Sequence, residues 1–133
     1  MSLMIFMSPE HVAHMNVLLA ADPASKAACA TFDRRWDIVY ELSHGAETVW
    51  WTMRFDPVDG VSFLLETPTQ PGDVVFHGEY KAVIDSMRRM KAGDKDAQLP
   101  LTQSGNADAM AVIAPAYGAA HAAAAIHTEF PSV

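Results

Sequence analysis

Two runs of alternating side chains, joined by a short turn, dominate the middle of the chain. The stretch from 48 to 67 reads TVWWTMRFDPVDGVSFLLET, and its DPVDG segment has the Asp, Pro and Gly of a tight turn. Successive side chains of a strand point to opposite faces of a sheet. One face therefore carries only large apolar side chains: Val49, Trp51, Met53 and Phe55 before the turn, and Val61, Phe63 and Leu65 after it. The sequence predicts a β-hairpin with one strongly apolar face.

The same period of two recurs in the segments 36–43 and 73–77. Together with the hairpin, these segments predict an antiparallel meander of three or four strands. A further edge strand or extended segment is expected at 99–105, where Pro100 removes one backbone donor.

Helices are expected before and after these strands. Ser8 and Asp22 are each followed by proline, a pair typical of helix starts, which predicts one helix from Ser8 and another over 22–32. An apolar stripe predicts a third helix at 79–93, and a fourth is expected from 107 to about 126, kinked or split by its proline. Helices on one face of a mostly antiparallel sheet define an α+β fold.

Length and charge limit the class of protein. A chain of 133 residues corresponds to one domain. We expect that domain at 8–127, after a leader at 1–7 that is in part a cloning remnant and before a frayed tail at 128–133. The net charge of −7 argues against nucleic acid or an anionic membrane as the main partner, because both need clustered Lys and Arg.

Two further features bear on location. The longest apolar region, 107–126, is interrupted by Pro115, Gly118 and His121, so no stable membrane insertion is expected. The single cysteine, Cys29, excludes an internal disulfide and favours a reducing compartment.

Candidate catalytic groups are few. His11 and His14 have a spacing that a metal site can use, but two solvated side chains on an outer helix face explain them better. Asp37 and Glu41 lie on the mixed face of their strand, where cross-strand ion pairs account for them. Cys29 lies among alanines, as a buried inert thiol does. The sequence therefore predicts no enzyme activity, no cofactor and no metal.

The apolar face permits two interpretations. Large sheet residues can interdigitate with the small residues of the alanine-rich last helix and form an ordinary core. Alternatively, the covering helices leave an apolar cavity that holds a lipid-like ligand. Periodicity does not separate a filled core from a lined cavity.

Four phrases in order resemble the sterol carrier protein type 2 family. They are an amphipathic helix ending in LLAADP before a second alanine-rich helix, the strands DIVYEL, VWWTMRF and VSFLLET, the strand–Gly–helix step DVVFHGEYKAVIDSMRRMKAGD, and LTQSGNADAMAVIAPAY. The resemblance covers most of the chain, and order and spacing carry it. The segment AGDKDAQLPLTQSGN departs from it, lacking Met-Lys and Gly-Lys phrases common in the family.

The resemblance implies a curved sheet of about five strands, covered on one face by helices, with an apolar tunnel for a fatty acid, acyl-CoA or sterol. It implies non-enzymatic binding, and transfer of that ligand, by a protein that is free to form a homodimer. The C-terminal FPSV is not a peroxisomal signal, which favours a bacterial cytoplasmic protein. By inward parity, the ligand-binding residues implied are Trp51, Met53, Phe55, Phe63, Leu65, Phe76, Met87, Met90, Ile113 and Tyr117.

Two rival functions remain open from the sequence. A small cone-shaped isomerase also encloses an apolar pocket, but it needs a buried carboxylate or histidine in the lining, and the inward strand positions carry none. An accessory or interaction module without ligand is the other rival, for which a large exposed apolar patch is the expected sign. Polar candidates for orienting a ligand are Tyr40, Arg54, Gln103 and Tyr117.

Overall fold

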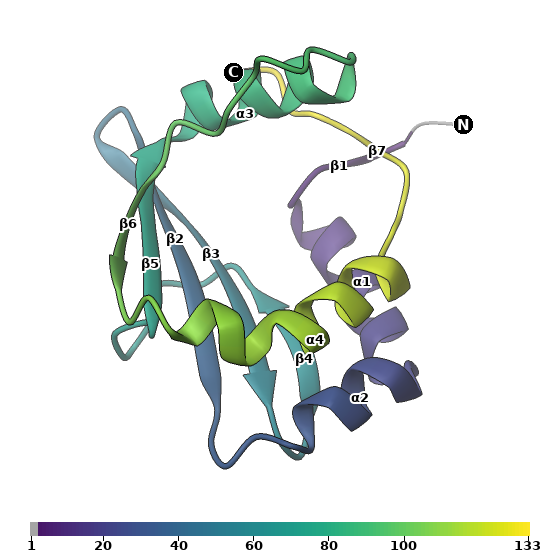
Figure 1. Cartoon of the computed structure of the whole chain (residues 1–133). Helices are drawn as coiled ribbons and strands as arrows, with labels where there is room; N and C mark the ends of the chain where they lie inside the picture. Colours follow the sequence, from purple (N-terminus) through teal and green to yellow (C-terminus); the bar gives the residue numbers. More distant parts are fainter. Residues whose placement is uncertain (1–2) are drawn as a thin grey trace.

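A computed structural model describes residues 3–133 and places four helices around a five-stranded sheet (Figure 1). The elements in chain order are β1 (Met4–Ile5), α1 (Pro9–Ala20), α2 (Pro23–Cys29), β2 (Trp36–His44), β3 (Glu47–Asp56), β4 (Gly60–Leu64), β5 (Val74–Glu79), α3 (Tyr80–Lys91), β6 (Thr102–Gly105), α4 (Ala109–Ala123) and β7 (Thr128–Glu129). Both proline-led helix starts are confirmed, since the Ser8 and Asp22 side chains accept hydrogen bonds from the backbone N–H groups of His11 and Ser25.

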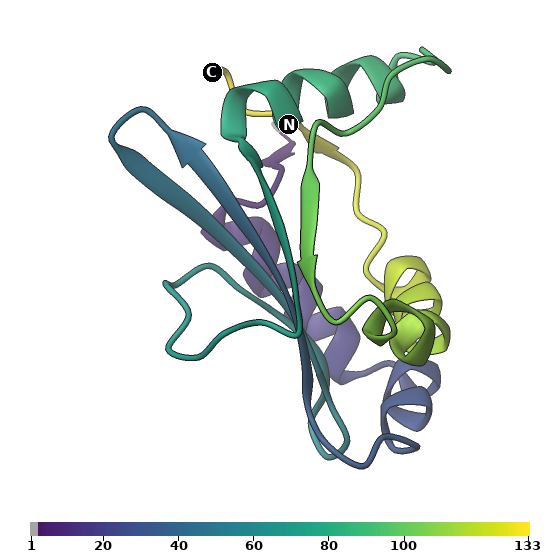
Figure 2. The same cartoon turned by 60° about the vertical axis from the view of Figure 1, so that its left-hand side comes forward.

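The main sheet has the strand order β4-β3-β2-β5-β6. β2 pairs antiparallel with β3, β3 with β4 and β5 with β6, whereas β2 and β5 run parallel. The predicted simple meander is therefore wrong for 73–77, which pairs with the first strand of the sheet and not with the third. The segment between β4 and β5 carries the chain back across the outer face, on the side away from α4 (Figure 2).

Two hydrogen bonds between Asp37 and Asp73 hold the end of this connecting segment against the sheet. The Asp73 carboxylate accepts a hydrogen bond from the Asp37 backbone N–H at 2.8 Å, and the Asp73 N–H donates to the Asp37 carbonyl at 2.9 Å. Gly72 lies so close to Val39 that an added Cβ would approach its side chain to 2.7 Å. The start of β5 is thereby held against β2.

The large residues of the strands share the inner face, as parity predicts. In the antiparallel registers Tyr40 lies opposite Trp51, and Met53 lies opposite Phe63. In the parallel register Tyr40 lies beside Phe76, and the two rings stack with centroids 5.1 Å apart. One core cluster joins this face to α1, α2 and α4, and a second joins it to α3.

The last helix is shorter than the sequence indicates. α4 covers Ala109–Ala123 instead of 107–126 and stays a single helix through Pro115, so the expected split does not occur. α2 likewise ends at Cys29, three residues before the expected end at Phe32.

The two ends of the chain pair with each other. β1 and β7 form a two-stranded parallel sheet, and the Phe6 and Phe130 rings meet at 5.3 Å. The expected frayed tail is therefore wrong for Thr128–Glu129, because strand pairing and an aromatic contact hold it. The first two residues of the expected cloning remnant lie outside the described residues. No described helix combines the length and the apolar character needed to cross a bilayer.

Candidate ligand cavity

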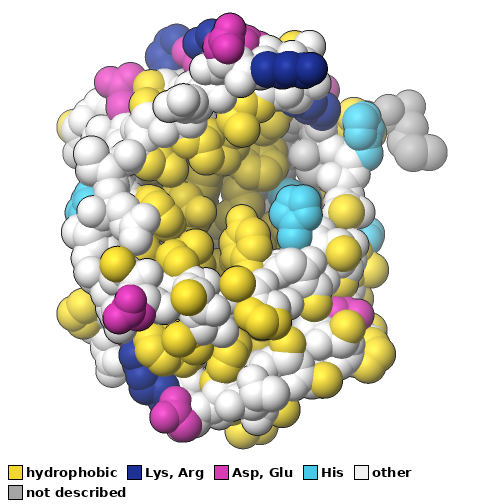
Figure 3. Space-filling view, in the orientation of Figure 1, with side chains coloured by type: hydrophobic (Ala, Val, Ile, Leu, Met, Phe, Trp, Pro, Cys, Tyr) yellow, Lys and Arg dark blue, Asp and Glu magenta, His cyan; other side chains and the backbone are white. Residues whose placement is uncertain are grey.

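A cavity of about 350 Å³ lies between the inner sheet face and the helices. It opens on the side seen in Figure 3, where apolar side chains cover most of the hollow. The sheet supplies one wall, with Tyr40, Trp51, Thr52, Met53 and Phe63. The N-terminal segment and α1 supply Phe6, Met7, His11 and Met15, and α3 supplies Met87. The remaining lining residues come from α4 and the segment after it: Tyr117, Ala120, His121, Ala124, Ala125, Ile126 and Thr128. The inner face is therefore part core and part cavity wall.

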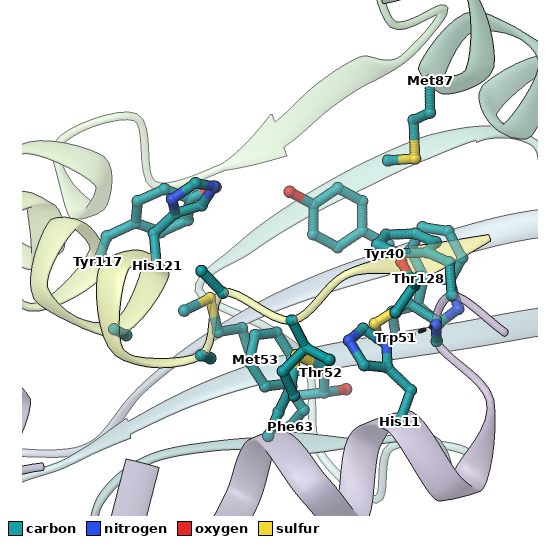
Figure 4. Close-up of a pocket in the computed structure, with 17 residues that line it drawn as sticks. His11, Tyr40, Trp51, Thr52, Met53, Phe63, Met87, Tyr117, His121 and Thr128 are labelled. Atoms are coloured by element: carbon teal, nitrogen blue, oxygen red, sulfur yellow. Dashed lines mark hydrogen bonds between the residues drawn. The ribbon is translucent and has the colours of Figure 1, made fainter. Parts of the chain in front are cut away.

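The structure brings five of the ten residues expected from the sequence to this cavity. They are Trp51, Met53, Phe63, Met87 and Tyr117. Their side chains come from the sheet, α3 and α4 and surround the space drawn in Figure 4.

The other five residues lie elsewhere. Phe55 and Ile113 are 0% and 1% exposed, belong to the core cluster that joins the sheet to α1, α2 and α4, and do not line the cavity. Phe76 lies against the Tyr40 ring, Leu65 packs between the two core clusters, and Met90, in the last turn of α3, is 47% exposed. The alternation along each strand predicts which of its side chains point toward the helices. Whether such a side chain borders the cavity depends on the distance between the sheet and the helices at that position.

His11 is the main residue that sequence analysis placed wrongly. It is 3% exposed rather than solvated, and it lines the cavity. The chain before α1 folds back over the ring, with Met7 at φ 57°, and the Met7 N–H donates to Nδ1 of His11 at 2.9 Å. A signal was present, because His11, Met15 and Leu19 recur every four residues and form the buried stripe of α1.

Burial and neighbouring groups set the protonation of the polar lining. Burial lowers the pKa of His11 from its usual value, and the nearby His14 lowers it further, so the ring is neutral at pH 7. Burial also raises the pKa of Tyr40 to about 12, with a smaller contribution from Tyr117. His11 and Tyr40 thus present neutral hydrogen-bonding groups to the cavity.

Two of the four candidate orienting groups lie at the cavity. The Tyr40 hydroxyl points toward the α4 side of the space, where Tyr117 stacks on His121 with centroids 6.4 Å apart (Figure 4). Arg54 instead bonds Asp37 on the outer sheet face, with its Nε 3.1 Å from Oδ1, and Gln103 is an exposed residue of β6. No Asp or Glu lines the cavity in the described part of the chain, but the buried His11 does, so the lining holds one of the two kinds of group that the isomerase alternative requires.

A second polar group lies on the outer sheet face. Glu41 Oε2 is 2.6 Å from Nδ1 of His77, and Nε2 of His77 is 3.1 Å from the Ser104 hydroxyl. The Glu41 and His77 side chains are about 40% exposed, so water competes for each of them. We interpret the three as a solvated cross-strand network. Among residues 3–133 no three His, Cys, Asp or Glu side chains gather as a metal site does.

Comparison with known proteins gives matches only at the level of structure. No family model matches the sequence, and no curated protein does. A protein from Thermus thermophilus, described as a possible sterol carrier protein, superposes with a TM-score of 0.52 at 15% identity, covering 99% of this chain and 96% of that one. A crystal structure of sterol carrier protein 2 superposes at 0.51 with 12% identity, covering 92% and 99%. The chain has the sterol carrier protein 2 fold.

This sterol carrier protein 2 fold confirms the α+β class expected from the sequence. The sheet is mixed and mostly antiparallel, with the β2–β5 pair as its parallel step. The likeness extends over nearly the whole chain, including the segments that form the cavity walls.

Proposed function

We propose that this protein binds a lipid-like molecule, without chemical conversion, in the cavity between the sheet and the helices. The cavity itself carries the proposal: about 350 Å³ of space, open on one side and walled by Trp51, Met53 and Phe63. Sites for small molecules are concave and mostly apolar, with a few placed polar groups. At about 30 Å³ for each water-sized group, 350 Å³ holds roughly a dozen non-hydrogen atoms.

The size and walls of the cavity favour a single alkyl chain or its end. Each methylene removed from water contributes about 0.8 kcal/mol, which supplies the driving force without any charged contact. Methionine side chains, which adapt to irregular shapes, line the space from the sheet, α1 and α3. The proposal includes a role as a carrier, in which the ligand enters and leaves through the open side of the cavity. The description of one structural neighbour as sterol carrier protein 2, and of the other as possibly a sterol carrier protein, supports it.

Contact quenching of Trp51 tests the binding site. The chain has three tryptophans, and only Trp51 lines the cavity among the described residues. In a Trp36→Phe/Trp50→Phe variant, 11-bromoundecan-1-ol should quench the remaining fluorescence strongly and saturably, because its bromine reaches the indole. Unbrominated 1-undecanol should not quench.

The matched control is Trp51→Phe, which keeps the two tryptophans outside the cavity. It should show little saturable quenching with the same brominated alcohol. Equal quenching in the two proteins would place the ligand outside the cavity, and no quenching in either would show that no ligand reaches Trp51. Both results would refute the proposal.

A further inference from the structure

One ring nitrogen of His11 forms a hydrogen bond within the protein, and the other does not in the described part of the chain. Nδ1 accepts the hydrogen bond from the Met7 N–H, so it carries the lone pair and the ring proton lies on Nε2. Within residues 3–133 the structure gives Nε2 no hydrogen-bond partner. A buried ring therefore holds one free N–H donor in a fixed direction.

That donor faces the cavity. In Figure 4 the second ring nitrogen of His11 lies on the side of the ring away from the dashed hydrogen bond and faces the space between the labelled side chains. Among the described residues, Trp36 Nε1 is the one side-chain polar atom that is both sealed from solvent and unpartnered. His11 Nε2 thus borders space that a water-sized group can reach, although the residue as a whole is 3% exposed.

The charges of the lining decide which acceptor suits this donor. No Lys or Arg lines the cavity in the described part of the chain, and both Tyr40 and His11 are neutral. Beside the neutral His11 an ionised carboxylate would lose its hydration without gaining a counter-charge from Lys or Arg, which is costly. A carbonyl oxygen loses less hydration and regains one hydrogen bond.

We propose that the cavity selects an uncharged lipid-like ligand whose carbonyl oxygen accepts a hydrogen bond from Nε2 of His11. The inference rests on the proposed function and names its ligand class: a ketone, ester or thioester rather than a free carboxylate. His11 is then the polar anchor at the buried side of the cavity, and Tyr117 and His121 flank the α4 side.

Two substitutions of His11 test the roles of its two ring nitrogens one at a time. In His11→Asn the amide oxygen takes the place of Nδ1, so the bond from the Met7 N–H is kept and the donor into the cavity is lost. In His11→Gln the longer side chain puts an N–H group near the position of Nε2, so the donor is kept and the bond to Met7 is lost.

The probes are valerophenone and pentylbenzene, which differ by one carbonyl oxygen and fit a space for about a dozen atoms. Equilibrium dialysis gives the affinity of each probe for the wild type and both variants. We expect His11→Asn to lower the ratio of valerophenone affinity to pentylbenzene affinity roughly two- to tenfold, the range of one net hydrogen bond, because the lost ring contacts affect both probes alike. His11→Gln should retain most of the valerophenone affinity.

Each other outcome is decisive. If the ratio of the two affinities in His11→Asn is the same as in the wild type or higher, the inference is wrong while the proposed function stands. If the wild type binds neither probe, the cavity is not a ligand site, and the proposed function fails together with the inference. Circular dichroism of both variants serves as the control that they are folded.

Discussion

Ala124→Phe is expected to bind cavity ligands at least about a hundredfold more weakly than the wild type. Ala124 follows the last turn of α4, lines the cavity and is 8% exposed, so a phenyl ring at this position is expected to enter the empty space. The ring removes room for roughly four to six methylenes of ligand, each contributing about 0.8 kcal/mol, and a hundredfold loss corresponds to about 2.8 kcal/mol. The loss is measured by titrating 1-undecanol into protein that holds the brominated alcohol and recording the recovery of Trp51 fluorescence as the quencher is displaced.

Ala122→Phe is the matched control for this variant. Ala122 is an exposed residue two positions earlier in α4, and it does not line the cavity. The same aromatic ring placed there should leave ligand affinity within about twofold of the wild type. Equal affinities for both variants would mean that the cavity is not where the ligand binds.

Phe55→Ala is expected to lower the free energy of unfolding by about 3–5 kcal/mol, the range for removing a large aromatic side chain from a packed core. Phe55 is 0% exposed, packs in the core cluster that joins the sheet to α1, α2 and α4, and does not line the cavity. Urea unfolding followed by circular dichroism measures the change.

Phe63→Ala provides the comparison, since Phe63 shares the inner face but lines the cavity and is only half-buried. Its ring already lacks neighbours on one side, so the substitution should cost less, about 1–2 kcal/mol, while it enlarges the cavity and weakens ligand binding. If Phe63→Ala destabilises the fold as much as Phe55→Ala, the division of the inner face into core and cavity wall is wrong.

The strand pattern predicted which side chains point to the inner face, but not which of them lie in the packed core and which line the cavity. Met53 and Phe55 are two residues apart on β3 and point the same way, yet only Met53 reaches the cavity. The difference depends on where the helices approach the sheet, which is a property of tertiary packing that period-two alternation does not encode. The same limit explains why Met87 lines the cavity while Met90 faces solvent.

Strand order and the position of His11 required long-range contacts. Side-chain parity is the same whether β5 pairs with β2 or β4, so the Asp37–Asp73 bonds that fix the parallel pair could not be derived from alternation. His11 resembles a solvated residue in isolation. It is buried because the N-terminal segment pairs with the C-terminal segment and closes over α1.

A crystal structure with 11-bromoundecan-1-ol tests ligand binding in the cavity most directly, because the anomalous signal of bromine marks the ligand without ambiguity. We expect one bromine site per chain inside the space bordered by Trp51, Met53 and Phe63, and no such site in Ala124→Phe crystals grown with the same compound. A cavity filled by its own side chains, or bromine sites confined to the outer surface, would contradict lipid binding at this position.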